Sequence, residues 1–187
     1  MMWAANYGGS MYGFQTYSKT PLMLSMLGGV VGDAAVQKAI SGYAHAWRFK
    51  HPSPWDFAFF MNRALDRDLG WFWYYWLWTT ESVDGSIQDV VTSGSKTTVT
   101  IRQDGQMPSP VVLRVTLAAD GLPVRPMPNA RMIDEVTAIV RWPVDVWFGG
   151  SRTFQAELDF GAPVEAITLD PSGRFPDRDP GDNVWRR

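Results

Sequence analysis

Through the first 84 residues, apolar positions recur with the period of an α-helix. One stripe follows a break at Gly32 and Asp33, and its members lie at i, i+4, i+7 and i+11: Val36, Ile40, Tyr43 and Trp47. This spacing predicts an amphipathic helix that buries its apolar face. Ahead of it, residues 12–29 place two tyrosines before an apolar helical pattern that closes on two glycines, which predicts another helix.

Two more helices are predicted before residue 84. The letters SPWD place Ser53 at an N-cap, Pro54 at the first helical position and Asp56 three residues after the cap. The apolar face of this helix is Phe57, Phe60, Met61, Ala64 and Leu65. After a break at Gly70, the run WFWYYWLW over residues 71–78 predicts a short helix that is apolar on every side and therefore buried.

From residue 86 onward the pattern is that of short strands separated by turns. The segments that carry it are KTTVTIRQ, SPVVLRVTLAADG, EVTAIVRWPVDVWFGG, RTFQAELDFG and VEAITLD. Residues 121–132, which are rich in proline, are predicted to form a loop. We therefore predict an α+β fold in two parts, with a helical domain over residues 1–84 and an immunoglobulin-like β-sandwich over residues 85–187.

Composition narrows the range of partners. Of the 187 residues, 45% are apolar and 19% charged, which is typical of a folded globular chain. The formal net charge of -2 offers no basic surface for nucleic acid or for an anionic membrane. The longest apolar run is about a third of the length that a membrane span needs. Because the chain has no cysteine, disulfides and thiolate metal sites are excluded.

Candidate metal sites are few. The two histidines, His45 and His51, are six residues apart and do not share a helical face as the pair in H-E-x-x-H does. Pro52 is expected to end the helix at the second of them. The acidic clusters at residues 66–68 and 177–182 lack the spacing of a calcium loop, so solvated turns are the preferred interpretation. The sequence therefore predicts no metal site in this chain.

Tyr12 and Tyr17 are the remaining candidates for chemistry. A phenol at such a position is most often a core aromatic whose hydroxyl reaches a backbone carbonyl. The functional alternative is a neutral donor aimed from the start of a helix at a developing oxyanion. The residues alone do not separate these two interpretations.

Four segments together resemble a known family. They are TYSKTPLMLSMLGG, YAHAWRFKHPSPWDF, DLGWFWYYWLW and the last part of the chain, from PVDVWFGG to NVW. In order and spacing they are similar to the downstream part of the aminopeptidase N-like zinc metallopeptidases, the gluzincin aminopeptidases. The resemblance covers nearly the whole chain.

The resemblance implies a fold and a site. The helical part would be the distal half of a thermolysin-like catalytic domain, followed by the β-sandwich. Tyr17 would be the tyrosine that donates to the tetrahedral intermediate, and Tyr12 a second active-site tyrosine found in some members. Thr20 and Pro21 stand where the family often has glycine and a small residue. The family's zinc helix, glutamate ligand and exopeptidase motif have no counterpart in the 187 residues.

The functional prediction follows from this resemblance. We expect a C-terminal fragment of a zinc-dependent aminopeptidase, inactive alone, whose partners are the upstream zinc-binding half, which would hold the zinc cofactor, and a peptide substrate. An apolar docking face for that half would make the chain self-associate. The alternative is a noncatalytic interaction module built on its many aromatic residues. A less favoured third function is carbohydrate binding through Trp142 and Trp147 on the strands.

Overall fold

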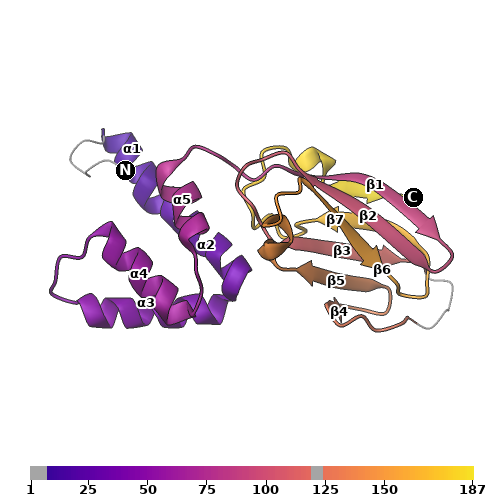
Figure 1. The fold of residues 1–187 in the computed structure, drawn as a ribbon, viewed down its shortest axis with the longest axis horizontal. Helices are drawn as coiled ribbons and strands as arrows, with labels where there is room; N and C mark the ends of the chain where they lie inside the picture. Colours follow the sequence, from indigo (N-terminus) through magenta and orange to yellow (C-terminus); the bar gives the residue numbers. More distant parts are fainter. Residues whose placement is uncertain (1–7, 119–123) are drawn as a thin grey trace. The chain divides into compact units, whose positions relative to one another are not determined.

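The computed structural model describes residues 8–118 and 124–187, and the chain forms two compact units (Figure 1). The first unit ends at Glu81 and is helical, whereas the second begins at Ser82 and contains two antiparallel sheets. The α+β class predicted from the sequence is confirmed at this level.

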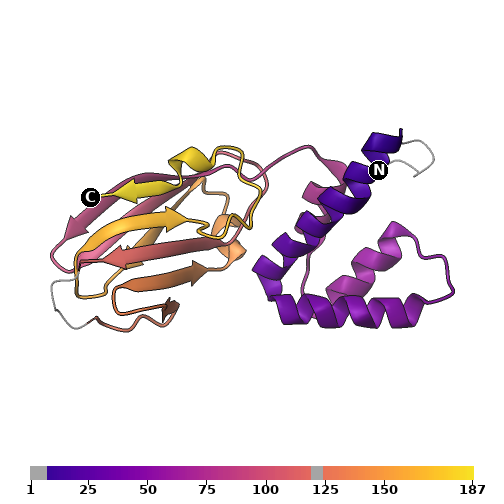
Figure 2. The ribbon, with the colours of Figure 1, turned by 180° about the vertical axis from the view of Figure 1, so that it is seen from behind.

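The first unit opens with one continuous helical run, which is drawn as a long rod in Figure 2. It consists of α1 (Gly9–Phe14), a π-helical turn η2 (Gln15–Lys19) and α2 (Thr20–Val31). The sequence predicted that this helix ends at Gly28 and Gly29, but it continues through both of them. A glycine inside a helix lowers helix stability by only about 1 kcal/mol relative to alanine, so it does not force an end. It ends at Gly32, whose φ of 96° is a conformation that side chains disfavour.

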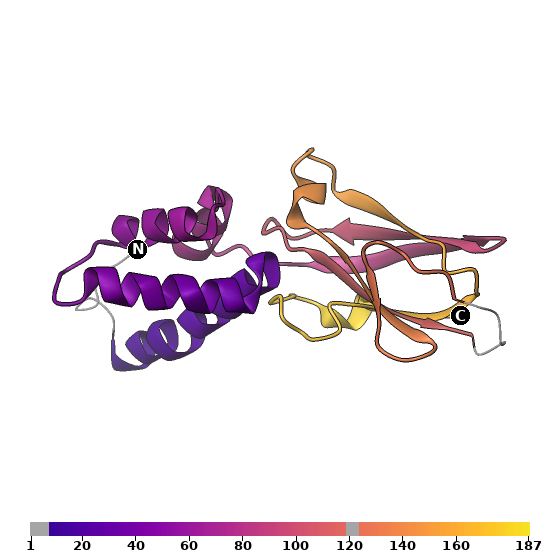
Figure 3. The same cartoon turned by 90° about the horizontal axis from the view of Figure 1, so that it is seen from below.

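One further helix packs beside this run, and a second packs on that helix. α3 (Asp33–Trp47) contacts both α2 and α4 (Pro54–Leu65), as Figure 3 shows. The predicted stripe of α3 is confirmed: Val36 is buried, and Tyr43 meets Phe57 of α4 edge to face with ring centroids 5.0 Å apart. The predicted face of α4 is confirmed except at Ala64, which is exposed, while Ala58 is buried in its place.

α5 (Gly70–Trp78) buries only one of its faces, although its sequence is apolar or aromatic on every side. Phe72, Trp73 and Trp76 are buried, and Trp73 Nε1 donates a hydrogen bond of 2.7 Å to Asn62 Oδ1 of α4. Tyr74 and Trp78 are exposed, so the prediction of burial on every side was wrong. The described helices of this small unit cover only one side of α5.

The start of α4 is the predicted capping box. Ser53 Oγ accepts from the backbone N–H of Asp56, and the Asp56 carboxylate accepts from the Ser53 N–H at 2.8 Å and from its hydroxyl at 2.6 Å. These bonds from Ser53 lower the pKa of Asp56. A lowered pKa in the folded state means that the ionised carboxylate stabilises the fold, and that this stability is lost as the pH falls through the folded pKa.

We expect Ser53→Ala to lower the free energy of unfolding of the helical unit by about 1 kcal/mol at neutral pH, because the helix loses its cap. The penalty should shrink in acid, where Asp56 is protonated and its bonds to Ser53 are already weakened. Urea titrations followed by helical circular dichroism at several pH values measure this. Ser41→Ala, on the exposed face of α3, is the matched control; a Ser53 penalty equal to that of the control would contradict the capping account.

The second unit consists of two antiparallel sheets. One has the strand order β1-β2-β6, formed by β1 (Gly85–Ser93), β2 (Lys96–Gln103) and β6 (Thr153–Leu158). The other has the order β4-β5-β3-β7-β8, formed by β3 (Val111–Leu117), β4 (Ala130–Met132), β5 (Thr137–Trp142), β7 (Val164–Leu169) and β8 (Val184–Arg186). Short 3₁₀ turns η3 (Val144–Trp147) and η4 (Pro180–Asp182) follow β5 and precede β8.

Both sheets contribute to one buried core. Val99 of β2 and Leu158 of β6 belong to the same cluster as Leu113 of β3, Val140 of β5 and Ile167 of β7. The five segments picked out by alternation each contain one of the described strands. The sequence missed β1 and β8 and placed the whole of β4 inside the proline-rich loop predicted over residues 121–132. The apolar residues of β1 do not alternate regularly, and the three-residue strands β4 and β8 carry too little periodicity. Residues 121–123 of that loop lie outside the described part.

Gly105 allows two loops of this unit to approach closely. A Cβ built at this position would clash with the carbonyl oxygen of Ser82 and would lie 2.6 Å from the backbone nitrogen of Asp84. The Gly105 N–H donates to the Asp84 carbonyl at 3.2 Å, which ties the loops together. The segment that leads into β1 therefore lies directly against Gly105, and any larger residue at this position would push it away.

We expect Gly105→Ala to destabilise the second unit by about 1–3 kcal/mol, the usual cost of forcing extra volume into a packed site. Thermal unfolding followed by circular dichroism of the strands measures the loss. Gly149→Ala is the control, because a Cβ there meets no atom within 4 Å and the backbone is not left-handed. Equal melting temperatures for the two variants would contradict the close approach.

Candidate functional site

The sequence suggested that Tyr17 precedes a helix, but in the structure it lies inside the continuous helical run. It belongs to the π-helical turn, in which the Thr20 N–H donates to the carbonyl of Gln15, five residues earlier. The ring of Pro21 would otherwise meet the carbonyl four residues before it, which is that of Tyr17, and the wider turn accommodates it. π-helical turns inside α-helices are frequent at functional sites.

Both candidate tyrosines point their side chains into solvent. Tyr17 is 77% exposed and Tyr12, on α1, is 44% exposed. The interpretation of Tyr17 as a core phenol bound to a backbone carbonyl therefore finds no support in this chain. An exposed phenol in a non-standard turn is available to a ligand or to another protein segment.

A cleft of about 500 Å³ lies beside the π-helical turn. One wall is formed by Gln15, Lys19, Thr20 and Met23, and the other by residues 76–81, at the end of α5 and just after it. Among the described residues, neither Tyr12 nor Tyr17 lines this cleft. The sequence analysis did not find the cleft, because it forms between segments more than fifty residues apart and its aromatic wall was interpreted only as core.

Trp76 gives the cleft an unusual wall. Its side chain is 4% exposed, and within the described part of the chain its Nε1 has no hydrogen-bond partner. The indole groups of Trp73 and Trp147 differ, because they donate to Asn62 Oδ1 and to the Ser109 carbonyl. The only indication of an unpaired indole in the sequence is that the run at residues 71–78 contains several tryptophans and no polar side chain except tyrosine.

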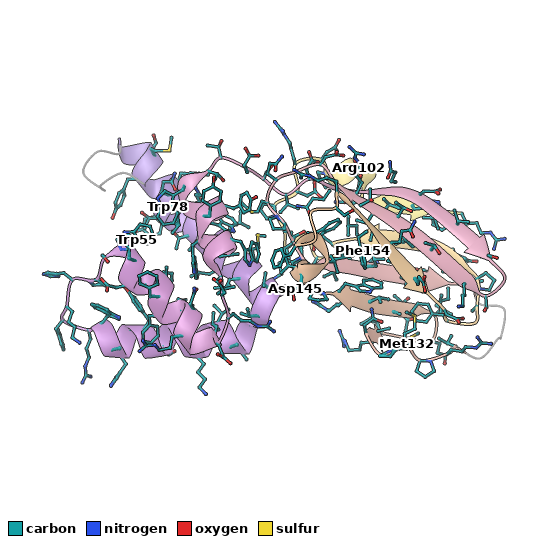
Figure 4. All side chains as sticks on the ribbon, viewed as in Figure 1. Trp55, Trp78, Arg102, Met132, Asp145 and Phe154 are labelled. Atoms are coloured by element: carbon teal, nitrogen blue, oxygen red, sulfur yellow. The ribbon has the colours of Figure 1, made fainter. Side chains whose placement is uncertain are left out.

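A second surface of the helical unit presents stacked aromatic rings. Trp55 of α4 and Trp78 of α5 lie together in Figure 4, with centroids 4.8 Å apart and planes 23° apart. Both remain exposed, as do Phe59 on α4 and Phe49, which is 99% exposed in the turn after α3. Rings of this size at a surface are typical anchors of protein interfaces.

The histidines do not form a zinc site. His45 lies in the last turn of α3, and His51 is an exposed residue in the connection before α4. The helix ends at Trp47 and not at His51, because Arg48 has an extended ψ of 137° and Phe49 follows with a left-handed φ of 62°. In the described ranges no three His, Asp or Glu side chains come together as metal ligands. The residues present therefore do not fit the zinc ion that the family resemblance implies.

The remaining sequence candidates have structural explanations. Trp142 and Trp147 are half-buried and pack edge to face on Phe154, so each ring is partly covered by the core of the second unit. Asp177 accepts hydrogen bonds from Gly85 N–H and Asn183 Nδ2. Burial, with Asp179 and Asp177 nearby, raises the pKa of Asp182. The acidic cluster at 177–182 thus connects backbone segments of the second unit.

Comparison with known proteins finds a similarity of structure and none of sequence. No protein-family model matches the chain, and no curated protein is similar to it in sequence. Among solved structures, the fold is similar to that of Legionella pneumophila aminopeptidase A in complex with aspartic acid, with a TM-score of 0.62 and 13% identity. The likeness covers 90% of this chain and 18% of that chain, so the chain spans about a fifth of the length of its structural neighbour. At this identity the likeness concerns the fold. Within the described residues, no helix has the length and apolar character to cross a bilayer.

Proposed function

We propose that this chain corresponds to the distal part of the catalytic domain of a zinc-dependent aminopeptidase, together with the β-sandwich that follows it. The helical unit would be the distal half of a thermolysin-like domain, and the two-sheet unit the immunoglobulin-like sandwich. The observation that carries the proposal is the fold likeness to an aminopeptidase over 90% of this chain. A second observation supports the proposal: Tyr17 is exposed in a π-helical turn, where a substrate could reach its hydroxyl.

In this proposal Tyr17 is the transition-state donor, and Tyr12 assists it from the preceding turn of the same helical run. The phenol O–H would donate to the oxygen that gains negative charge as the peptide carbonyl becomes tetrahedral. A helical position suits this role, because the backbone on both sides of the turn is hydrogen-bonded and fixes the origin of the side chain. Its exposure leaves the hydroxyl free to face a substrate held by another segment.

The zinc ligands and the general base would come from an upstream part of the protein. His45 and His51 do not supply a ligand set, so no catalytic step is assigned to a metal held by the described residues. We propose that the chain alone hydrolyses no peptide, and that the upstream half and the peptide substrate are its partners. Some of the exposed apolar groups on the helical unit would be covered by that half.

The coding sequence directly upstream tests this proposal. We expect an in-frame H-E-x-x-H motif within about one short domain of Met1, followed by a glutamate on the next helix. The motif provides two histidine ligands on one helical face and a glutamate base. An upstream region without it would favour the second candidate function.

That second candidate is a noncatalytic interaction module, and the stacked Trp55–Trp78 pair with Phe49 and Phe59 favours it. Exposed rings of this kind would bind another protein or a second copy of the chain. Light scattering and binding of a hydrophobic dye measure this. Self-association that is abolished by Trp55→Ser, unaffected by Lys38→Gln and retained when the upstream coding region is included would support the module, because the docking face of a fragment would then be covered. A monomer that binds no dye would count against it.

A further inference from the structure

We propose that the outward face of the five-stranded sheet binds an acidic segment of another polypeptide. The feature that carries the proposal is a group of three exposed arginines, Arg131 of β4, Arg141 of β5 and Arg114 of β3, which we call the arginine face. These strands are consecutive in the order of the sheet, as Figure 1 shows. The proposal uses no residue of the helical unit, so it does not depend on the proposed aminopeptidase function.

The register of the strands places the three arginines on the same side of the sheet. Arg131 is opposite Ile139, and Ile139 is opposite Arg114, so these residues form one row across β4, β5 and β3. Arg141 lies two residues after Ile139 on β5, and residues two apart in a strand face the same side. Val140, between them, belongs to the buried core, so its two neighbours face away from that core.

The spacing of the arginine face suits an extended chain. Neighbouring strands are about 4.8 Å apart, and residues two apart along a strand are about 7 Å apart. The Cα atoms of Arg131 and Arg114 are therefore about 10 Å apart, and that of Arg141 lies about 8 Å from each. Because alternate side chains of an extended peptide are also about 7 Å apart, carboxylates at alternate positions can reach neighbouring guanidinium groups.

The carboxylates of this sheet leave the arginine face unneutralised. Asp134 accepts from two backbone N–H groups of the β4–β5 turn, and Asp170 accepts hydrogen bonds within the loop that follows β7. Glu135 and Glu165 are exposed at the margins, in that turn and at the bulge of β7. Within the described residues, no ion pair joins any of the three arginines to a carboxylate. The face therefore presents concentrated positive charge to solvent.

The chemistry of the face favours an acidic polypeptide over a nucleic acid. A guanidinium group donates paired hydrogen bonds to a carboxylate, and clusters of arginines are a recurring means of binding acidic motifs. The formal net charge of the chain is -2, which opposes the approach of a long polyanion, whereas a short acidic segment meets mainly the local field. The described residues in the rows of the arginines include no aromatic ring on which a base could stack.

Fluorescence anisotropy of a labelled peptide tests the proposal. The probe is a short peptide that alternates glutamate with threonine, and its matched control alternates glutamine with threonine. The full chain should bind the glutamate peptide saturably and the glutamine peptide at least about tenfold more weakly. Rising salt should weaken the first interaction. Equal affinity for the two peptides, or no saturable binding of the glutamate peptide, would overturn the proposal.

Three variants locate the binding site. Arg114→Gln, Arg131→Gln and Arg141→Gln each keep a long side chain beside Ile139, and thermal unfolding checks that the fold is retained. Each should weaken binding of the glutamate peptide about tenfold. Lys96→Gln, which removes the same charge from β2 of the other sheet, should leave the affinity unchanged. Unchanged affinity in the three arginine variants would overturn the site. Tighter binding of oligothymidylate or of phosphatidylserine vesicles than of the glutamate peptide would overturn the choice of partner.

Discussion

Tyr17→Phe should lower turnover by about 10²- to 10³-fold in the protein that joins this chain to its zinc-binding part, because one donor to the developing oxyanion is lost. Substrate affinity should hardly change, since an interaction made mainly in the transition state lowers kcat and kcat/KM together. Steady-state kinetics with aminoacyl anilides separate the two quantities. The ring is retained, so the exposed position should keep its stability.

Tyr74→Phe is the matched control for this experiment. Tyr74 is another exposed tyrosine of the helical unit, on α5, and loses the same hydroxyl without a proposed role. We expect it to leave kcat unchanged. A Tyr17→Phe protein with the activity of this control would remove Tyr17 from the site and leave it as a surface phenol.

Phe72→Ala should cost about 3–5 kcal/mol of unfolding free energy, the range for a fully buried phenylalanine. Phe72 is fully buried, and its ring meets those of Trp73 at 5.1 Å and Trp76 at 6.2 Å between centroids. Because domains are stable by only about 5–15 kcal/mol, this loss is a large part of the stability of the helical unit. Urea titration of the helical circular dichroism signal measures the loss.

Phe59→Ala provides the comparison in the same unit. Phe59 is 68% exposed on α4, so its removal should change stability by less than about 0.5 kcal/mol. Similar losses in the two variants would mean that α5 does not form the core of this unit as described.

The features that the sequence predicted well depend on neighbours close along the chain. The capping box at Ser53 and Asp56 requires four consecutive residues, and the alternation of β2 from Lys96 to Gln103 requires eight. The stripe from Val36 to Trp47 is likewise a property of one helix. In each case the local pattern agrees with the burial found in the fold, so the pattern alone was enough to predict the element.

The features that the sequence missed depend on partners far along the chain. Whether a face of α5 is covered is decided by its packing on α4, so the exposure of Trp78 could not be deduced from an apolar run. β8 gains its structure from pairing with β7 and not from its own three residues. The cleft at Lys19 and Trp76 exists only after the helices pack. Of the candidate site, the sequence contributed Tyr17 and Tyr12 through a resemblance, and their exposure and the π-helical turn became visible only in the fold.

Hydrolysis of aminoacyl anilides by two proteins tests the central claim most directly. One protein is residues 1–187 alone with added zinc, and the other is the same chain preceded by its own upstream coding region. The account predicts chelator-sensitive hydrolysis by the longer protein and none by residues 1–187. Chelator-sensitive turnover by residues 1–187 alone, or no hydrolysis by the longer protein, would contradict it.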